Sequence, residues 1–74
     1  MINVQVARKP PLDSVRPIKV AIDALEAEMD GKGRLLVRYS GTENLVRVMV
    51  EGQDEGTINN HAESIAKVIR EEIG

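Results

Sequence analysis

Two arginines, Arg38 and Arg47, flank a short polar segment in which two hydroxyl side chains surround a glycine, Ser40-Gly41-Thr42. A guanidinium group presents a planar fork of N–H donors that matches the oxygens of phosphate. Hydroxyl groups can add further donors, and glycine lets the backbone approach a ligand closely. These residue types, so close together, indicate a phosphate site. The alternative is an ordinary turn with two solvated arginines, because Ser, Gly and Thr are common in turns.

The polar segment lies between two short runs rich in aliphatic and β-branched residues, Leu35–Val37 and Leu45–Val50. This arrangement predicts a β-hairpin. Side chains alternate between the two faces of a strand, so placing the valines of both runs on one buried face sets the register. That register closes a four-residue loop, Gly41–Asn44, and puts Arg38 opposite Arg47 on the other face. Like charges in such a pair repel each other unless both reach into water or share an anion.

The rest of the chain predicts the elements that must position this hairpin. Apolar and polar residues alternate over Met1–Val6, which indicates a half-buried strand. A helix with one apolar stripe is expected over Pro17–Asp30, with Gly31 as its left-handed stop. The hairpin follows over Arg34–Glu51. A second striped helix is expected to run from its N-cap Asp54 to about Ile73.

The predicted order is therefore β-α-β-β-α. Both apolar stripes must be covered, and the valine face of the hairpin can cover them. We predict a single α+β domain over residues 1–74, a two-layer sandwich in which a small, mainly antiparallel sheet carries both helices on one face. The opposite face would hold Leu36, Leu45 and Met49 around the two arginines.

Composition narrows the classes of function. The chain has no cysteine and a single histidine, His61, which leaves no thiolate metal site. It contains no cluster of carboxylates suited to Mg²⁺ and no Walker-type phosphate loop, so we predict no catalytic residue, metal ligand or cofactor in this chain. It has neither a signal-peptide pattern nor a stretch that could span a bilayer, so a cytoplasmic protein without a membrane partner is the default expectation.

A nucleic-acid partner is not expected either. Some RNA-binding sheets share the β-α-β-β-α order, but they stack bases on aromatic side chains of their open face. This chain has one aromatic residue, Tyr39, and a net charge of −2. A non-enzymatic binding module of that kind would require Tyr39 to reach the open face.

The segment from Gly33 to Gly52 resembles the C-terminal phosphate-binding domain of the α-D-phosphohexomutase family, and within it the phosphoglucosamine mutase branch. The family pattern is Arg-x-Ser-Gly-Thr-Glu-x-x-x-Arg followed by Val-Met-Val-Glu. It is matched at Arg38, Ser40, Gly41, Thr42, Glu43, Arg47, Val48, Met49, Val50 and Glu51. Asn44 stands where most members carry proline, which removes some rigidity but no ligand group. A looser likeness extends over nearly the whole chain, including Lys9-Pro10-Pro11-Leu12.

The resemblance implies that Glu43 braces the loop or an arginine, and that five residues bind the phosphate of a phosphosugar substrate: Arg38, Ser40, Gly41, Thr42 and Arg47. It also implies that the chain is the fourth domain of a longer enzyme, whose three preceding domains carry the phosphorylated serine and the Mg²⁺ site. Such an enzyme would interconvert glucosamine 6-phosphate and glucosamine 1-phosphate through a bisphosphorylated intermediate. A sister mutase acting on glucose or mannose phosphates is the alternative, because this loop does not choose the sugar.

Overall fold

The chain folds into three strands and two helices, which the computed structural model describes over all 74 residues, Met1 to Gly74. Their order is the predicted β-α-β-β-α, with one short 3₁₀ turn before the first helix. The elements are β1 (Ile2–Gln5), the 3₁₀ turn (Leu12–Ser14), α1 (Arg16–Met29), β2 (Arg34–Tyr39), β3 (Leu45–Glu51) and α2 (Glu55–Ile73). The predicted elements are all present, and their ends differ from the prediction by about one residue, the usual uncertainty of element ends.

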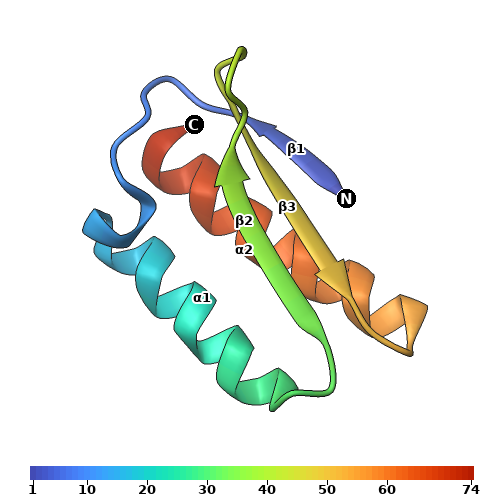
Figure 1. Ribbon diagram of the computed structural model, residues 1–74. Coiled ribbons are helices and arrows are strands. Elements are labelled where there is room, and N and C mark those ends of the chain that lie inside the picture. Colours follow the sequence, from blue (N-terminus) through green and yellow to red (C-terminus); the bar gives the residue numbers. More distant parts are fainter.

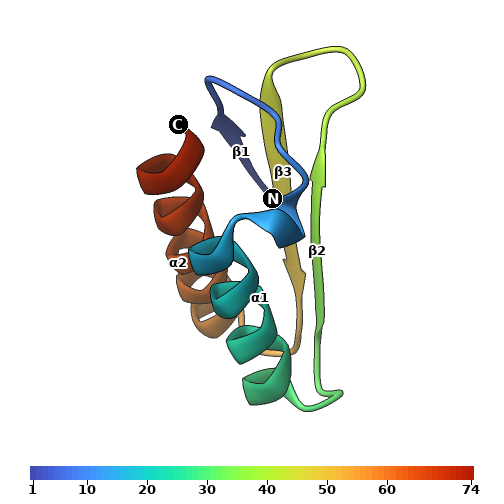
Figure 2. The same cartoon turned by 90° about the vertical axis from the view of Figure 1, so that its left-hand side faces the viewer.

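The sheet is antiparallel throughout and has the strand order β1-β3-β2, so that β3 lies in the middle. Both helices pack side by side on one face of the sheet (Figures 1 and 2). The other face carries no helix, and the turn between β2 and β3 extends beyond one end of the sheet (Figure 2). This is the α+β two-layer sandwich expected from the two apolar helix stripes.

The register of the hairpin is the predicted one. Val37 lies opposite Val48, and Arg38 lies opposite Arg47. The two valines belong to the face covered by the helices, and the two arginines therefore share the open face. On the other side of β3, Asn3 of β1 lies opposite Arg47. One row across the open face thus contains an amide and two guanidinium groups.

The core lies between the valine face of the sheet and the two helices. Val46 and Val48 of β3, Ile18 of α1 and Ile69 of α2 are fully excluded from solvent. The predicted apolar stripes account for this, because each places its residues about one helical turn apart on the covered side. Neither α1 nor α2 combines the length and the apolar character that crossing a lipid bilayer requires.

The start of α2 is capped as predicted. The Thr57 amide donates to a carboxylate oxygen of Asp54 over 2.8 Å, which satisfies one of the free N–H groups of the first turn. The Thr57 hydroxyl and amide together hold the pKa of the Asp54 carboxyl below its usual value. The cap therefore stabilises the fold above the ordinary carboxyl pKa, and its contribution is lost as the pH falls through the lowered value.

The end of α1 corrects one expectation. The left-handed backbone begins at Asp30, with φ of 47°, one residue before the predicted Gly31, which has φ of 76°. Aspartate is among the non-glycine residues that adopt this conformation most readily, since its short side chain can form local hydrogen bonds. The reversal into β2 therefore takes two successive left-handed residues.

Candidate functional site

The turn between β2 and β3 borders an open depression of about 450 Å³ at one end of the sheet. All five residues predicted to bind phosphate line it together with Tyr39: Arg38, Tyr39, Ser40, Gly41, Thr42 and Arg47. They come from the last two residues of β2, from the loop itself and from the first half of β3. The hairpin register, rather than their spacing in sequence, brings the two arginines to the same wall.

The two arginines of the depression are exposed and have no acidic partner. The ion pairs of the chain are Lys19–Asp23 and Glu63–Arg70, both on helices. Residues opposite each other on antiparallel strands have Cβ atoms about 5 Å apart, so the charges of Arg38 and Arg47 lie close together. This arrangement has an electrostatic cost in the free chain, and an anion held between the two guanidinium groups would remove it.

Ser40 organises the loop from inside. It is the one buried polar residue of the chain, at 6% exposure. Its hydroxyl oxygen accepts hydrogen bonds from the amides of Thr42 and Glu43, each over 3.3 Å, and its own amide donates to the Leu45 carbonyl over 2.9 Å. The hydroxyl proton remains available to a ligand, but the oxygen acts first as a brace that shapes the loop.

The packing of this chain does not require a glycine at position 41. The φ of Gly41 lies outside the left-handed region, and a Cβ atom built on it would meet nothing within 4 Å. Its N–H makes no hydrogen bond to another backbone group, whereas the amides of Thr42 and Glu43 are used within the loop. The backbone at Gly41 is therefore open to an approaching ligand and offers a free donor.

Glu43 contributes its backbone rather than its carboxylate. Its amide donates to Ser40 as described, while its side chain is exposed and is in neither ion pair of the chain. The role predicted for Glu43, bracing either the loop or an arginine, stays a prediction.

Tyr39 lies on the covered face of the sheet, opposite Val46, and packs against the core. Its hydroxyl donates to the Pro10 carbonyl. The aromatic ring is therefore not presented on the open face, which a base-stacking RNA module would need. Burial raises the pKa of the Tyr39 phenol above its usual value, and the nearby charge of Arg8 acts in the opposite direction.

Tyr39 provides a spectroscopic test of the site, because it is the only aromatic residue of the chain. In a pH titration followed by phenolate absorbance, we expect the folded chain to ionise above the usual value of 10.0. A phenol with a raised pKa binds its proton more tightly in the folded state, so this stabilisation is complete below the unfolded-state pKa and is lost as the pH rises through the folded-state pKa.

The urea-unfolded chain serves as the reference for this titration, and Arg8→Met should raise the folded midpoint further by removing the opposing charge. A folded midpoint at or below that of the unfolded chain would contradict the packing described for Tyr39.

Sequence reasoning missed two residues near the depression. Asn3 enters the row of Arg38 and Arg47 through the pairing of β1 with β3. Lys9 donates from its ammonium group to the Ser40 carbonyl over 3.1 Å. The only sequence signal for Lys9 was the basic pair that it forms with Arg8. That pair did not indicate whether the Lys9 side chain contacts the loop or lies in solvent.

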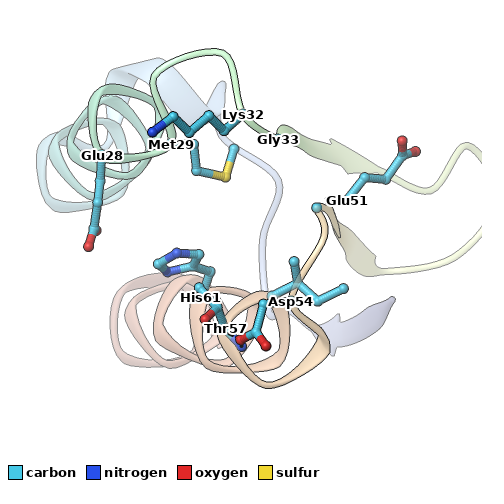
Figure 3. Close-up of a pocket in the computed structure, with 10 residues that line it drawn as sticks. Glu28, Met29, Lys32, Gly33, Glu51, Asp54, Thr57 and His61 are labelled. Carbon is cyan, nitrogen blue, oxygen red and sulfur yellow. Dashed lines mark hydrogen bonds between the residues drawn. The ribbon is translucent and has the colours of Figure 1, made fainter.

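A second hollow of about 270 Å³ lies at the other end of the sheet, between the end of α1 and the start of α2 (Figure 3). Its titratable side chains are three carboxylates, one ammonium group and one imidazole: Glu28, Glu51, Asp54, Lys32 and His61. The His61 ring lies between the two helices on the side of Met29 (Figure 3). With carboxylates in excess, this hollow repels an anion, so the two hollows differ in charge as well as in position.

The Mg²⁺ implied by the family resemblance does not fit the residues of this chain. No three His, Cys, Asp or Glu side chains come together in a way that could hold a metal ion. The three carboxylates of the second hollow belong to different elements and do not form such a group.

Comparison with known proteins finds relatives that match nearly the whole chain, including the β2–β3 loop. Residues 1–68 match the family model described as phosphoglucomutase/phosphomannomutase, C-terminal domain. The chain is 54% identical over 71 residues to a phosphoglucosamine mutase of Symbiobacterium thermophilum, covering 96% of this chain and 16% of the relative.

Two further phosphoglucosamine mutases show the same pattern of coverage. That of Deinococcus radiodurans is 48% identical over 71 residues, covering 96% of this chain and 16% of the relative. That of Chlamydia muridarum is 45% identical over 74 residues, covering 100% of this chain and 16% of the relative. The chain thus spans about one sixth of the length of the curated relatives it matches.

Proposed function

Because this chain belongs to the phosphoglucomutase/phosphomannomutase C-terminal domain family, we propose that it binds the phosphate group of a phosphosugar in the depression of its β2–β3 loop. The observation that carries the proposal is the pair Arg38 and Arg47: two guanidinium groups side by side on the open face, without acidic partners, next to the free amide of Gly41. A dianionic phosphate satisfies all of these groups at once.

Each residue of the site has a definite role in this proposal. Arg38 and Arg47 neutralise the phosphate and set its orientation through their planar forks of donors. The Thr42 hydroxyl and the Gly41 amide donate to further phosphate oxygens. Ser40 holds the loop in shape through its oxygen and can donate its proton, and Glu43 acts through its backbone.

We further propose that the domain serves a longer enzyme, an isomerase that interconverts glucosamine 6-phosphate and glucosamine 1-phosphate through a bisphosphorylated intermediate. The names of the relatives support glucosamine phosphate as the substrate. In that reaction the loop holds the phosphate that does not react, so that the other end of the sugar faces the phosphorylated serine. The contribution of this chain is positioning, which can lower a barrier by converting a bimolecular encounter into an ordered one.

The remaining parts of the reaction belong to the rest of such an enzyme. The phosphorylated serine and the Mg²⁺ site would be supplied by three preceding domains. The half-buried Leu36, Leu45 and Met49 beside the arginines would then face those domains across the substrate cleft. The cytoplasmic location expected from the sequence stays a prediction.

The description of the matched family supports one alternative to glucosamine phosphate as the substrate. It names phosphoglucomutase and phosphomannomutase, so a parent acting on glucose or mannose phosphates would use the same loop in the same way. Assays of the full-length protein on the three sugar phosphates would separate these possibilities. Preference for glucose or mannose phosphate would reject the glucosamine assignment and leave the phosphate site intact.

An NMR titration of this chain with glucosamine 6-phosphate tests the phosphate site directly. We expect amide shifts confined to the loop residues 40–44, with a dissociation constant on the order of millimolar or weaker, because a few charge-assisted contacts at an open site must offset the cost of association. Glucosamine without phosphate is the control and should cause no shift in the loop. Shifts centred elsewhere, or none with a few tens of millimolar ligand, would reject the site.

A further inference from the structure

The first five residues of the segment between β1 and the 3₁₀ turn, Val6–Pro10, run alongside the β2–β3 loop and are hereafter called the strap. It contacts both ends of the loop. The Val6 amide donates to the Asn44 carbonyl over 3.0 Å, and the Lys9 ammonium donates to the Ser40 carbonyl over 3.1 Å. These are the first and last residues between the two strands, so the strap holds the loop at its base on both sides.

The strap is itself anchored to the rest of the fold. The Ala7 amide donates to the Ile73 carbonyl at the end of α2 over 2.8 Å, and the Pro10 carbonyl accepts from the Tyr39 hydroxyl. Tyr39 in turn packs against the core. The position of the loop is therefore tied to a helix end and to the core, and not to the hairpin alone.

Lys9 is the one strap residue whose side chain makes a hydrogen bond to the loop. Its ammonium group lies 5.9 Å from the centre of the Tyr39 ring, a distance at which the cation is attracted to the ring face. It belongs to neither ion pair of the chain. A lysine charge without a carboxylate partner is thus directed at one backbone carbonyl of the loop.

The Ser40 carbonyl and the Gly41 N–H belong to the same peptide unit. In a trans peptide these two groups point in opposite directions. By holding the carbonyl, Lys9 also sets the direction of the Gly41 N–H, which points away from Lys9. Gly41 lines the depression and Lys9 does not, so the free donor is kept on the ligand side.

We propose that Lys9 is a positioning residue of the anion site: it orients the Ser40–Gly41 peptide so that the Gly41 amide can donate to a bound phosphate. The inference rests on the proposed function of the loop and adds a residue more than thirty positions away in sequence, on a different segment. Lys9 acts through the backbone of the loop and does not touch the phosphate.

A purely electrostatic contribution of Lys9 would have a different signature. A distant charge attracts an anion through a field that salt screens within about 10 Å at 0.1 M ionic strength. An oriented peptide keeps its direction at any salt concentration. The ratio of affinities between a variant and the wild-type chain at low and high salt therefore separates the two.

The test measures binding of inorganic phosphate by NMR to wild type, Lys9→Met and Lys9→Arg at low and high salt. We expect Lys9→Met to raise the dissociation constant about fivefold at both salt concentrations, as expected for loss of one charge-assisted hydrogen bond, and Lys9→Arg to restore it to within about twofold. In the ligand-free Lys9→Met chain, the Gly41 and Thr42 amide resonances should already be shifted. Lys32→Met, at the other end of the sheet, removes the same charge as a matched control (Figure 3).

Several results would overturn the inference. Wild-type affinity in Lys9→Met, or a loss that Lys32→Met reproduces and that high salt abolishes, would leave Lys9 without a positioning role while the phosphate site stands. Unchanged loop amides in ligand-free Lys9→Met would do the same. Absence of phosphate shifts in the loop of the wild-type chain would instead remove the proposed function, and this inference with it. Because Lys9 is exposed, the dispersion of the remaining amide signals shows whether each variant is folded.

Discussion

Replacing Arg47 with alanine is expected to weaken binding of phosphate or glucosamine 6-phosphate by at least about tenfold, since each guanidinium–phosphate pair contributes a charge-assisted and often bidentate contact. Arg38→Ala should behave in the same way, and the double variant should lose detectable binding. Lysine at either position should restore only part of the affinity, because an ammonium group keeps the charge but not the planar fork. NMR titration of the loop amides measures all of these variants.

The same arginine variants should not destabilise the folded chain. Arg38 and Arg47 face each other across the hairpin, and removing one of them relieves a repulsion worth up to about 0.5 kcal/mol. The expected combination is lower affinity with equal or slightly higher stability in urea denaturation. Residues retained for function rather than for folding show this pattern.

Arg34→Ala is the matched control for the arginine variants. Arg34 lies on the same open face of β2 but at the far end of the strand, opposite Glu51. Its loss removes the same charge from the chain and should change phosphate affinity by less than about twofold, because exposed charges beyond a Debye length are largely screened. A loss in Arg34→Ala equal to that in Arg47→Ala would mean that the chain binds phosphate through its general charge, and the depression would lose its role.

Replacing Ile69 with alanine is expected to cost about 3 to 4 kcal/mol in the free energy of unfolding, as is usual for a large aliphatic side chain lost from a close-packed core. Ile69 lies at 0% exposure in α2, within the cluster that also contains Val46 and Val48 of the central strand. A chain of this length has a total stability of roughly 4 to 11 kcal/mol, so this single change removes a large part of it. Urea denaturation followed by circular dichroism measures the loss.

Val20→Ala provides the comparison for Ile69→Ala. Val20 is an apolar residue of α1 that remains 57% exposed, and its truncation should change the free energy of unfolding by less than about 0.5 kcal/mol. If Ile69→Ala cost less than about 1 kcal/mol, α2 would not be packed on the sheet as described. Because α2 also holds the strap through the Ile73 carbonyl, partial loss of its packing should broaden the loop amides before the chain unfolds.

The phosphate site is built from parts with different mechanical support. Arg38 stands on the edge strand β2 and Arg47 on the central strand β3, and the hydrogen-bonded ladder between these two strands fixes their relative positions. Gly41 and Thr42 stand on a loop whose shape depends on the Ser40 hydroxyl and on the strap. Strands hold the charges of a site more precisely than loops do, and the loop needs a second layer of contacts to hold its donors.

The period-two pattern of β2 and β3, together with the loop between them, was enough to predict the hairpin, its register and the common face of Arg38 and Arg47. These are local properties: alternation and turn length determine them within one hairpin, and burial of the valines allows only one solution. The helices and the Asp54 cap were predictable for the same reason, since each depends on residues within a few positions of one another.

Tertiary structure alone decided which strand lies beside β3, and with it the place of Asn3, the path of the strap and the contact of Lys9 with Ser40. It also decided that Ser40 is buried and that its hydroxyl serves the loop first. These contacts join segments far apart in the chain, and their formation depends on how the layers close around a common core. A local pattern of residues cannot predict these contacts, because the same alternating strand could pair with either free edge of the hairpin.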